Sequence, residues 1–209
     1  IITFSRVGGE GYDLAFKEYN YLALSEEEKA MLKYASDLRK EGKIKKVIIL
    51  INTSNALQVD FLKDEAYSID ACLWIGGVGI KGTNAVTDIL AGKVNPSGSL
   101  VDTYCYDNYS SPAMQNFTPT VYGGYDENSK ENPIPKEART YMIYQEGIYV
   151  GYKYYETHYE DYVMGTGNAG DYKYGDKVAF PFGFGLSYTQ FDYSNMSVKY
   201  NAETDQFEV

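Results

Sequence analysis

The chain has 209 residues, 44% of them hydrophobic and 23% charged, so it is long enough to bury a core as one or two domains. Its formal net charge of −10 argues against a nucleic-acid partner, because phosphate backbones attract basic surfaces, and fits a neutral small molecule or a carbohydrate. No apolar run approaches the roughly 20 residues that a membrane-spanning helix needs.

The first residues, Ile1–Phe4, are apolar and β-branched, which predicts a buried strand. A chain that opens inside a strand is expected to be a piece of a longer protein. The segment Gly8-Gly9-Glu10-Gly11 follows and places one carboxylate among glycines at the carboxyl end of that strand. Glycine gives the backbone freedom and lets another surface approach closely. Glu10 is therefore a candidate general acid/base, with an ordinary surface turn as the alternative.

A helix is expected next, from about Glu26 to Lys40. Ser25 and Glu28 form the pattern of a capping box at its start, and Gly42 marks its end. Residues 47–52 are an unbroken apolar run, which is typical of a strand buried on both faces of a parallel sheet.

Helical and extended segments then alternate. We expect a short helix or an irregular crossover at 56–62, a buried strand at 69–75, a glycine-rich loop at 76–82, a helix at 84–90 and a strand at 99–104. This alternation favours an α/β fold with a mostly parallel sheet that is truncated at its start.

The second half of the sequence is more polar and richer in tyrosine. Residues 105–145 predict a long surface loop, and residues 146–155 alternate in the manner of a strand. A polar, glycine-rich excursion is expected at 158–176. Residues 192–209 alternate again and resemble the first strands of a separate β-sandwich.

A glycine-rich motif offers a second functional hypothesis. Gly77, Gly79 and Gly82 match the G-x-G-x-x-G pattern between an expected strand and an expected helix, and Asp102 lies twenty positions further on. This spacing is that of a dinucleotide-binding site. A simple tight junction is the alternative, since Asp102 falls inside its expected strand and residues 165–170 match the same pattern in a loop.

Cys72 and Cys105 lie in apolar or strand-like contexts and are predicted to be buried free thiols. No C-x-x-C pair or cluster of histidine and cysteine suggests a metal site. His158 is the only histidine, and no G-x-S-x-G elbow accompanies it, so a Ser-His-Asp triad is not supported.

Several motifs occur together in a fixed order: GGEGYD at 8–13, KKVIILIN at 45–52, NAVTDILAGKVNPSG at 84–98, EGIYVGYKYYET at 146–157 and FPFGFGLSYTQF at 180–191. In this set the chain resembles the carboxyl-terminal α/β sandwich domain of glycoside hydrolase family 3, the β-glucosidase family. The resemblance implies two parts, a partial α/β sandwich over 1–191 and the beginning of a fibronectin type III-like domain over 192–209.

The same resemblance implies a retaining glycosidase that acts on β-linked glycosides or oligosaccharides and uses neither a cofactor nor a metal. Glu10 would be its acid/base, while the nucleophile would be an Asp on a (β/α)8 barrel domain of the same parent protein, outside this chain. Arg6 and Asp13 are candidate substrate contacts, and Asp13 is equally explained as a turn-forming residue. A structural domain of the same fold without a catalytic role remains the alternative.

Overall fold

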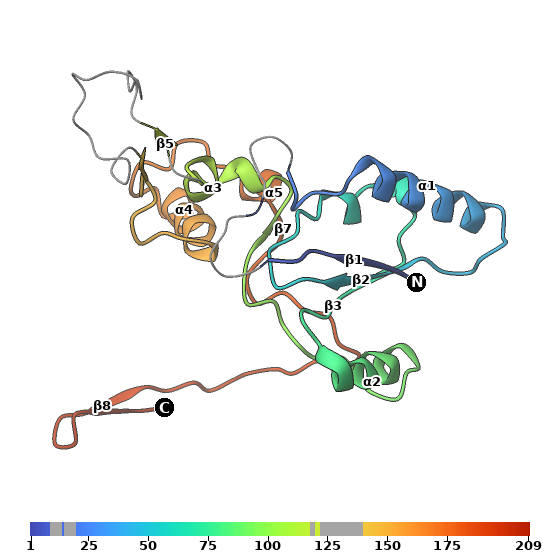
Figure 1. Ribbon diagram of the computed structural model, residues 1–209. Coiled ribbons are helices and arrows are strands. Elements are labelled where there is room, and N and C mark those ends of the chain that lie inside the picture. Colours follow the sequence, from blue (N-terminus) through green and yellow to red (C-terminus); the bar gives the residue numbers. More distant parts are fainter. Residues whose placement is uncertain (9–13, 15–19, 118–119, 122–139) are drawn as a thin grey trace, which may run out of the picture.

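The computed structural model describes residues 1–8, 14, 20–117, 120–121 and 140–209, and these form a mixed α/β structure (Figure 1). Its centre is a parallel sheet of β1 (Ile2–Ser5), β2 (Ile48–Asn52) and β3 (Ala71–Trp74) in the order β1-β2-β3. Because the strands are parallel, all three carboxyl ends lie at one edge, and Ser5 pairs with Asn52 there. The expected parallel strands are confirmed.

Helix α1 (Glu26–Lys40) begins and ends where the sequence predicts. The Ser25 side chain accepts from the Glu28 backbone, and the Glu28 side chain accepts from the Ser25 backbone, so the capping box is complete. After the helix, Gly42 adopts a φ of 74°, which favours glycine. The helix buries Leu32 and Ser36 on its inner face.

The main core lies between α1 and the central strand. Side chains from β1, α1, β2 and the crossover after β2 form one buried cluster, with Tyr104 and Ala179 added from the second half of the chain: Phe4, Leu24, Leu32, Val47, Ile49, Ile51, Leu57, Val59, Phe61, Tyr104 and Ala179. The crossover from β2 to β3 contains two short 3-10 helices, η1 (Asp60–Leu62) and η2 (Glu65–Tyr67). This cluster fixes the position of α1 relative to β1 and β2.

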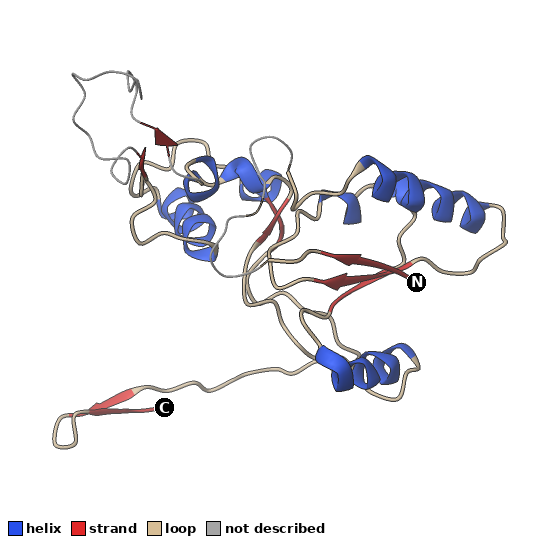
Figure 2. Ribbon diagram, viewed as in Figure 1, coloured by secondary structure: helices blue, strands red, loops and turns tan. Residues whose placement is uncertain are grey.

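The far side of the sheet is more open. Helix α2 (Gly79–Leu90) lies on the opposite side of the strands from α1 and buries none of its residues (Figure 2). The expectation of a buried strand at 69–75 is therefore wrong: β3 is an edge strand, Trp74 is 41% exposed and Cys72 is exposed. Cys105 is buried as expected, and both thiols are free.

The second half of the chain forms a smaller cluster around an antiparallel pair. The pair consists of β4 (Tyr104–Cys105) and β7 (Val178–Phe180), so only the end of the strand expected at 99–104 is extended. The remaining elements are short: η3 (Asn108–Ser110), α3 (Pro112–Gln115), β5 (Thr120–Val121), β6 (Thr140–Tyr141) and α5 (Tyr174–Lys177).

The strand expected at 146–155 is also wrong, because helix α4 (Tyr152–Met164) begins inside it. Gly151 adopts a φ of 60° just before the helix and turns the chain into it. Tyr155 is buried on the inner side of α4, and its hydroxyl lies 2.7 Å from the Ser110 hydroxyl. The helix replaces part of the polar excursion that the sequence predicted after residue 157.

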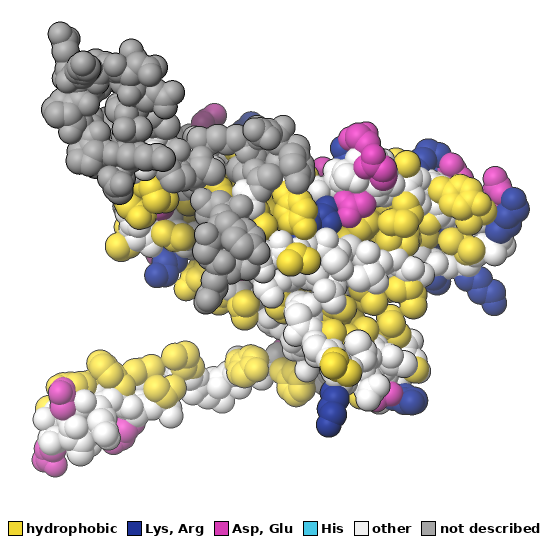
Figure 3. All heavy atoms as spheres, in the orientation of Figure 1, with side chains coloured by type: hydrophobic (Ala, Val, Ile, Leu, Met, Phe, Trp, Pro, Cys, Tyr) yellow, Lys and Arg dark blue, Asp and Glu magenta, His cyan; other side chains and the backbone are white. Residues whose placement is uncertain are grey.

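The last residues leave the body of the structure as an extended segment that ends in a hairpin of β8 (Lys199–Asn201) and β9 (Gln206–Glu208) (Figure 1). Hydrophobic side chains, coloured yellow in Figure 3, run along this segment, and Tyr193 and Met196 are among the most exposed. The fibronectin type III-like interpretation of 192–209 stays a prediction. Among the described residues, no helix is long and apolar enough to cross a membrane.

Candidate functional site

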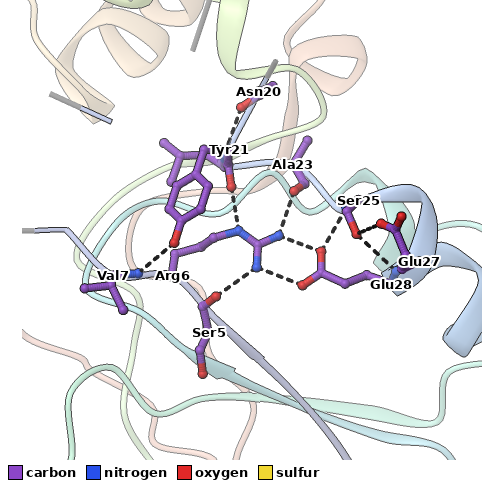
Figure 4. Close-up of polar contacts among 10 residues, drawn as sticks. Ser5, Arg6, Val7, Asn20, Tyr21, Ala23, Ser25, Glu27 and Glu28 are labelled. Carbon is purple, nitrogen blue, oxygen red and sulfur yellow. Dashed lines mark hydrogen bonds and ion pairs between the residues drawn. The ribbon is translucent and has the colours of Figure 1, made fainter. Parts of the chain in front are cut away.

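The candidate acid/base Glu10 and its neighbour Asp13 lie outside the described residues. The structure does describe the chain on both sides of them, through Gly8 on one side and from Asn20 on the other. The site is therefore built from these two flanks. Arg6, the third candidate from the sequence, is the first residue after β1 and lies between the flanks (Figure 4).

The guanidinium of Arg6 uses all five of its N–H donors within the chain. Nε donates to the carbonyl of Tyr21, Nη1 to that of Ser5 at 2.8 Å and Nη2 to that of Ala23 at 2.7 Å. The two remaining donors form a bidentate pair with the Glu28 carboxylate, at 2.8 Å and 2.7 Å. The Arg6 side chain is only 7% exposed. Every N–H donor of the guanidinium thus already has an acceptor within the chain. The role of Arg6 as a substrate contact stays a prediction.

Glu28 holds this arrangement from the first turn of α1. Its carboxylate accepts from Arg6 and, at 2.8 Å, from the backbone N–H of Ser25. Partial burial opposes ionisation of Glu28, but the hydrogen bonds from Arg6 and Ser25 outweigh it and lower the pKa of the carboxyl group. The sequence identified Glu28 only as a capping residue. Its pairing with Arg6, 22 positions away, has no local signal in the sequence.

Tyr21 adds two further contacts between the flanks. Its hydroxyl accepts from the backbone N–H of Val7 at 3.3 Å, and its ring lies under the Arg6 guanidinium, 5.4 Å from centroid to Cζ. On the same flank, the carbonyl of Leu22 accepts from the backbone N–H of Gln58 at 2.7 Å. The returning flank is thus attached both to β1 and to the crossover that follows β2.

Gly8 lies close to the turn that follows β2. A Cβ added at Gly8 would come within 2.9 Å of the Asn55 side-chain nitrogen, so a larger residue would displace that side chain. Asn55 is itself held by the Thr53 hydroxyl, which accepts from its backbone N–H at 3.0 Å. The glycine at this position permits a close approach between the carboxyl ends of β1 and β2, as the sequence suggested for this stretch.

The glycine-rich motif before α2 forms a strand-to-helix junction. Gly79 adopts a φ of 61° and is the first residue of α2, and a Cβ at Gly82 would meet the Val78 side chain at 3.0 Å. Asp102 accepts from the backbone N–H of Thr103 at 2.8 Å, and its carboxylate lies beside Gly151, the residue that precedes α4, where an added Cβ would meet it at 3.3 Å. The dinucleotide hypothesis gains no support from this geometry, and it stays a prediction.

Titratable side chains also gather in the smaller cluster of the second half. His158 stacks on Tyr172, with ring centroids 3.9 Å apart, and burial raises the pKa of the Cys105 thiol to about 11. Glu156 accepts hydrogen bonds from the hydroxyls of Thr103 and Tyr174 at 3.1 Å and 2.7 Å. These contacts give the side chains of this cluster a structural role in packing the second half of the chain. No group of three or more potential metal ligands occurs within the described ranges.

Comparisons with known proteins give a consistent result. The family model described as "Glycosyl hydrolase family 3 C-terminal domain" matches residues 1–152. A "Beta-glucosidase" of Ruminococcus albus is 32% identical over 194 residues, which are 93% of this chain and 16% of that protein. A "Beta-glucosidase A" of Butyrivibrio fibrisolvens is 30% identical over 213 residues, covering 91% of this chain and 21% of that protein.

A solved structure is similar as well. The crystal structure of a β-glucosidase from Paenibacillus barengoltzii matches with a TM-score of 0.67 and 29% sequence identity, covering 95% of this chain and 17% of that chain. In these three comparisons the chain spans about a sixth to a fifth of the length of its relatives.

Proposed function

We propose, since this chain belongs to glycosyl hydrolase family 3 and matches its C-terminal domain, that it forms one side of the active site of a retaining β-glycosidase. Its substrate class would be β-linked glycosides or oligosaccharides, because the relatives are named as β-glucosidases. Glu10 would be the general acid/base of this reaction. The catalytic Asp nucleophile would come from a (β/α)8 barrel domain of the parent protein.

One observation carries the proposal. Arg6 and Tyr21 hold together the two flanks of the segment that contains Glu10, directly at the carboxyl end of β1. In parallel α/β folds, ligands bind at the carboxyl ends of the strands. A segment whose two ends are fixed at this edge can present an acid to a substrate that lies between two domains.

The chemistry follows from the two carboxyl groups of a retaining glycosidase. In the first step, the nucleophile attacks the anomeric carbon while Glu10 donates its proton to the leaving-group oxygen, which gives a covalent glycosyl-enzyme. In the second step, Glu10 takes a proton from water while the water oxygen attacks the anomeric carbon, which breaks the bond between the sugar and the nucleophile. The two carboxyl groups must lie about 5–5.5 Å apart for this mechanism.

The remaining parts of the proposal concern the neighbours of Glu10 and the architecture. Asp13 would contact the substrate or form the turn after Glu10. The described residues would be part of a layered α/β sandwich. Residues 192–209 would begin a fibronectin type III-like domain. No cofactor takes part in this chemistry.

The proposal is tested in the parent protein with Glu10→Ala and a matched control, Glu160→Ala, which removes an exposed carboxylate from α4. The substrates are cellobiose, whose leaving group needs a proton, and 2,4-dinitrophenyl β-glucoside, whose leaving group does not. We expect Glu10→Ala to lower kcat/KM on cellobiose by about 10²–10⁴-fold and on the aryl glucoside far less. Equal activity of Glu10→Ala and wild type on cellobiose would favour a structural domain without a catalytic role.

A further inference from the structure

The hydrogen bonds of Arg6 cross the chain on both sides of the Glu10 segment. On the entering side its Nη1 donates to the carbonyl of Ser5, and on the returning side Nε and Nη2 donate to the carbonyls of Tyr21 and Ala23. One planar group therefore fixes the distance and the angle between the two flanks. Because these acceptors are backbone carbonyls, the hydrogen bonds constrain the main chain itself.

The same guanidinium is attached to a rigid support. Its partner Glu28 sits in the first turn of α1, where the capping box fixes the carboxylate from a second direction (Figure 4). One turn further along, Leu32 is fully buried in the main core. The position of the two flanks is thus set by the packing of α1 against the sheet.

We propose that Arg6 is a positioning residue that sets where Glu10 is presented to the glycosidic oxygen. This inference rests on the proposed function, in which Glu10 is the acid/base. It assigns to Arg6 a role that acts through the backbone of the flanks, and it does not require contact between Arg6 and the substrate.

Proton transfer makes the rate sensitive to such positioning. A general acid must come within about 2.6–3.2 Å of the atom that it protonates. A displacement of about 1 Å by a change away from the chemistry can lower the rate about 10²-fold. We therefore expect that relaxing the two flanks lowers the rate of proton transfer from Glu10.

The saturated guanidinium also distinguishes this role from direct substrate binding. All five donors of Arg6 are used within the chain, and its side chain is 7% exposed. To bind a sugar hydroxyl, Arg6 would have to give up one of these bonds. A direct contact with the glucose unit that both test substrates share would affect both alike, and a contact with the leaving-group glucose of cellobiose would raise KM for that substrate.

The test is made in the parent protein with Arg6→Lys, which keeps the charge but has three donors in place of a planar fork of five. The matched control is Arg39→Lys. Arg39 forms a similar bidentate pair with Asp70 at the other end of α1, at 2.8 Å and 2.7 Å, and is far in sequence from Glu10. Steady-state kinetics on cellobiose and on 2,4-dinitrophenyl β-glucoside are compared with the thermal unfolding midpoint of each variant.

We expect Arg6→Lys to lower kcat/KM on cellobiose by at least about tenfold, with KM changed less than about twofold, and to change kcat/KM on the aryl glucoside less than about threefold, because formation of the glycosyl-enzyme from the aryl glucoside needs no proton from Glu10. Arg39→Lys should lower the unfolding midpoint to a similar extent and leave the ratio of the two kcat/KM values unchanged. A merely structural role of Arg6 would lower both activities together, as in the control, and would overturn the inference.

Two further outcomes contradict the inference in different ways. A large rise in KM on both substrates with kcat preserved would make Arg6 a substrate contact. Wild-type kinetics of Arg6→Lys beside an inactive Glu10→Ala would reject only the positioning role. If Glu10→Ala itself hydrolyses cellobiose normally, the proposed function fails first, whatever the Arg6 variant does.

Discussion

Glu28 is the residue whose removal tests the described part of the site most directly. The substitution Glu28→Ala removes the carboxylate that accepts two hydrogen bonds from Arg6 and one from the Ser25 backbone N–H. The Arg6 side chain would keep its charge while only 7% exposed, and two of its donors would lose their acceptors. We expect this change to loosen both the start of α1 and the flanks that Arg6 joins.

The magnitude follows from the two roles of Glu28. Loss of the hydrogen bond from the Ser25 backbone N–H to the Glu28 carboxylate costs about 1 kcal/mol. An exposed ion pair contributes about 0.2–1 kcal/mol, and removal of one partner from a buried pair costs about 3–5 kcal/mol. Glu28 is 22% exposed, which places the pair between these cases, and we take about 2 kcal/mol. The sum of about 3 kcal/mol corresponds to about a 100-fold change in the local opening equilibrium.

Hydrogen exchange of the parent protein measures this opening. Backbone amides at the start of α1 and in residues 20–25 should exchange about 100-fold faster in Glu28→Ala. The control Glu26→Ala removes a carboxylate that is 85% exposed and pairs with Lys29, so it should change exchange less than about fivefold. Equal exchange in the two variants would refute the reasoning, because it would mean that the Arg6–Glu28 pair does not hold the flanks.

Three further predictions test other parts of the account. Leu32 is fully buried and Met31 beside it is 43% exposed, so Leu32→Ala should destabilise the domain by about 2–5 kcal/mol and Met31→Ala by less than about 1 kcal/mol in urea unfolding. Hydrogen bonds from Arg39, from the Val47 backbone and from Lys46 lower the pKa of Asp70. The stabilisation from Asp70 is thus present above the ordinary aspartate range and lost as the pH falls through the lowered pKa, and Asp70→Asn should flatten the acid limb of the unfolding midpoint plotted against pH. Millimolar NAD or NADP should leave the unfolding midpoint unchanged, and an increase would support the dinucleotide hypothesis for the motif before α2.

The sequence predicted the elements whose signals are local. Helix α1 carries its own start and stop, from the capping box of Ser25 and Glu28 to the glycine at 42, and both ends were placed correctly. The strand at 48–52 is an unbroken apolar run, and the sheet buries it as expected. In the helix, nearby side chains cap the backbone groups, and in the strand, the apolar residues themselves require burial. The local sequence therefore predicts both elements without knowledge of tertiary contacts.

The wrong predictions lie where the periodicities of a strand and a helix compete, or where burial depends on the neighbouring elements. Residues 146–155 alternate over a short stretch, but the helical spacing of Tyr155, His158 and Tyr162 becomes visible only when 152–164 are taken together. Burial of the strand at 69–75 was inferred from its apolar residues. In this chain β3 lies at the edge of the sheet, and all of its residues except the half-buried Leu73 are exposed.

The candidate site was predictable only in part. Arg6 is a candidate because it lies next to the Glu10 motif, yet four of its five hydrogen bonds reach the carbonyls of Tyr21 and Ala23 and the carboxylate of Glu28. Such contacts depend on how β1 and α1 come together in space, and no spacing in the sequence encodes them. Glu10 and Asp13, which lie outside the described residues, rest on the resemblance of their motif.

The central claim is that Glu10 is the acid/base, and chemical rescue tests it most directly. The parent protein carrying Glu10→Ala is incubated with 2,4-dinitrophenyl β-glucoside in the presence and absence of azide, and the sugar product is identified by NMR. A small anion can attack the glycosyl-enzyme without help from a general base. We therefore predict faster turnover with azide and β-glucosyl azide as the product. Turnover that azide does not accelerate, with glucose as the sole product, would contradict the account.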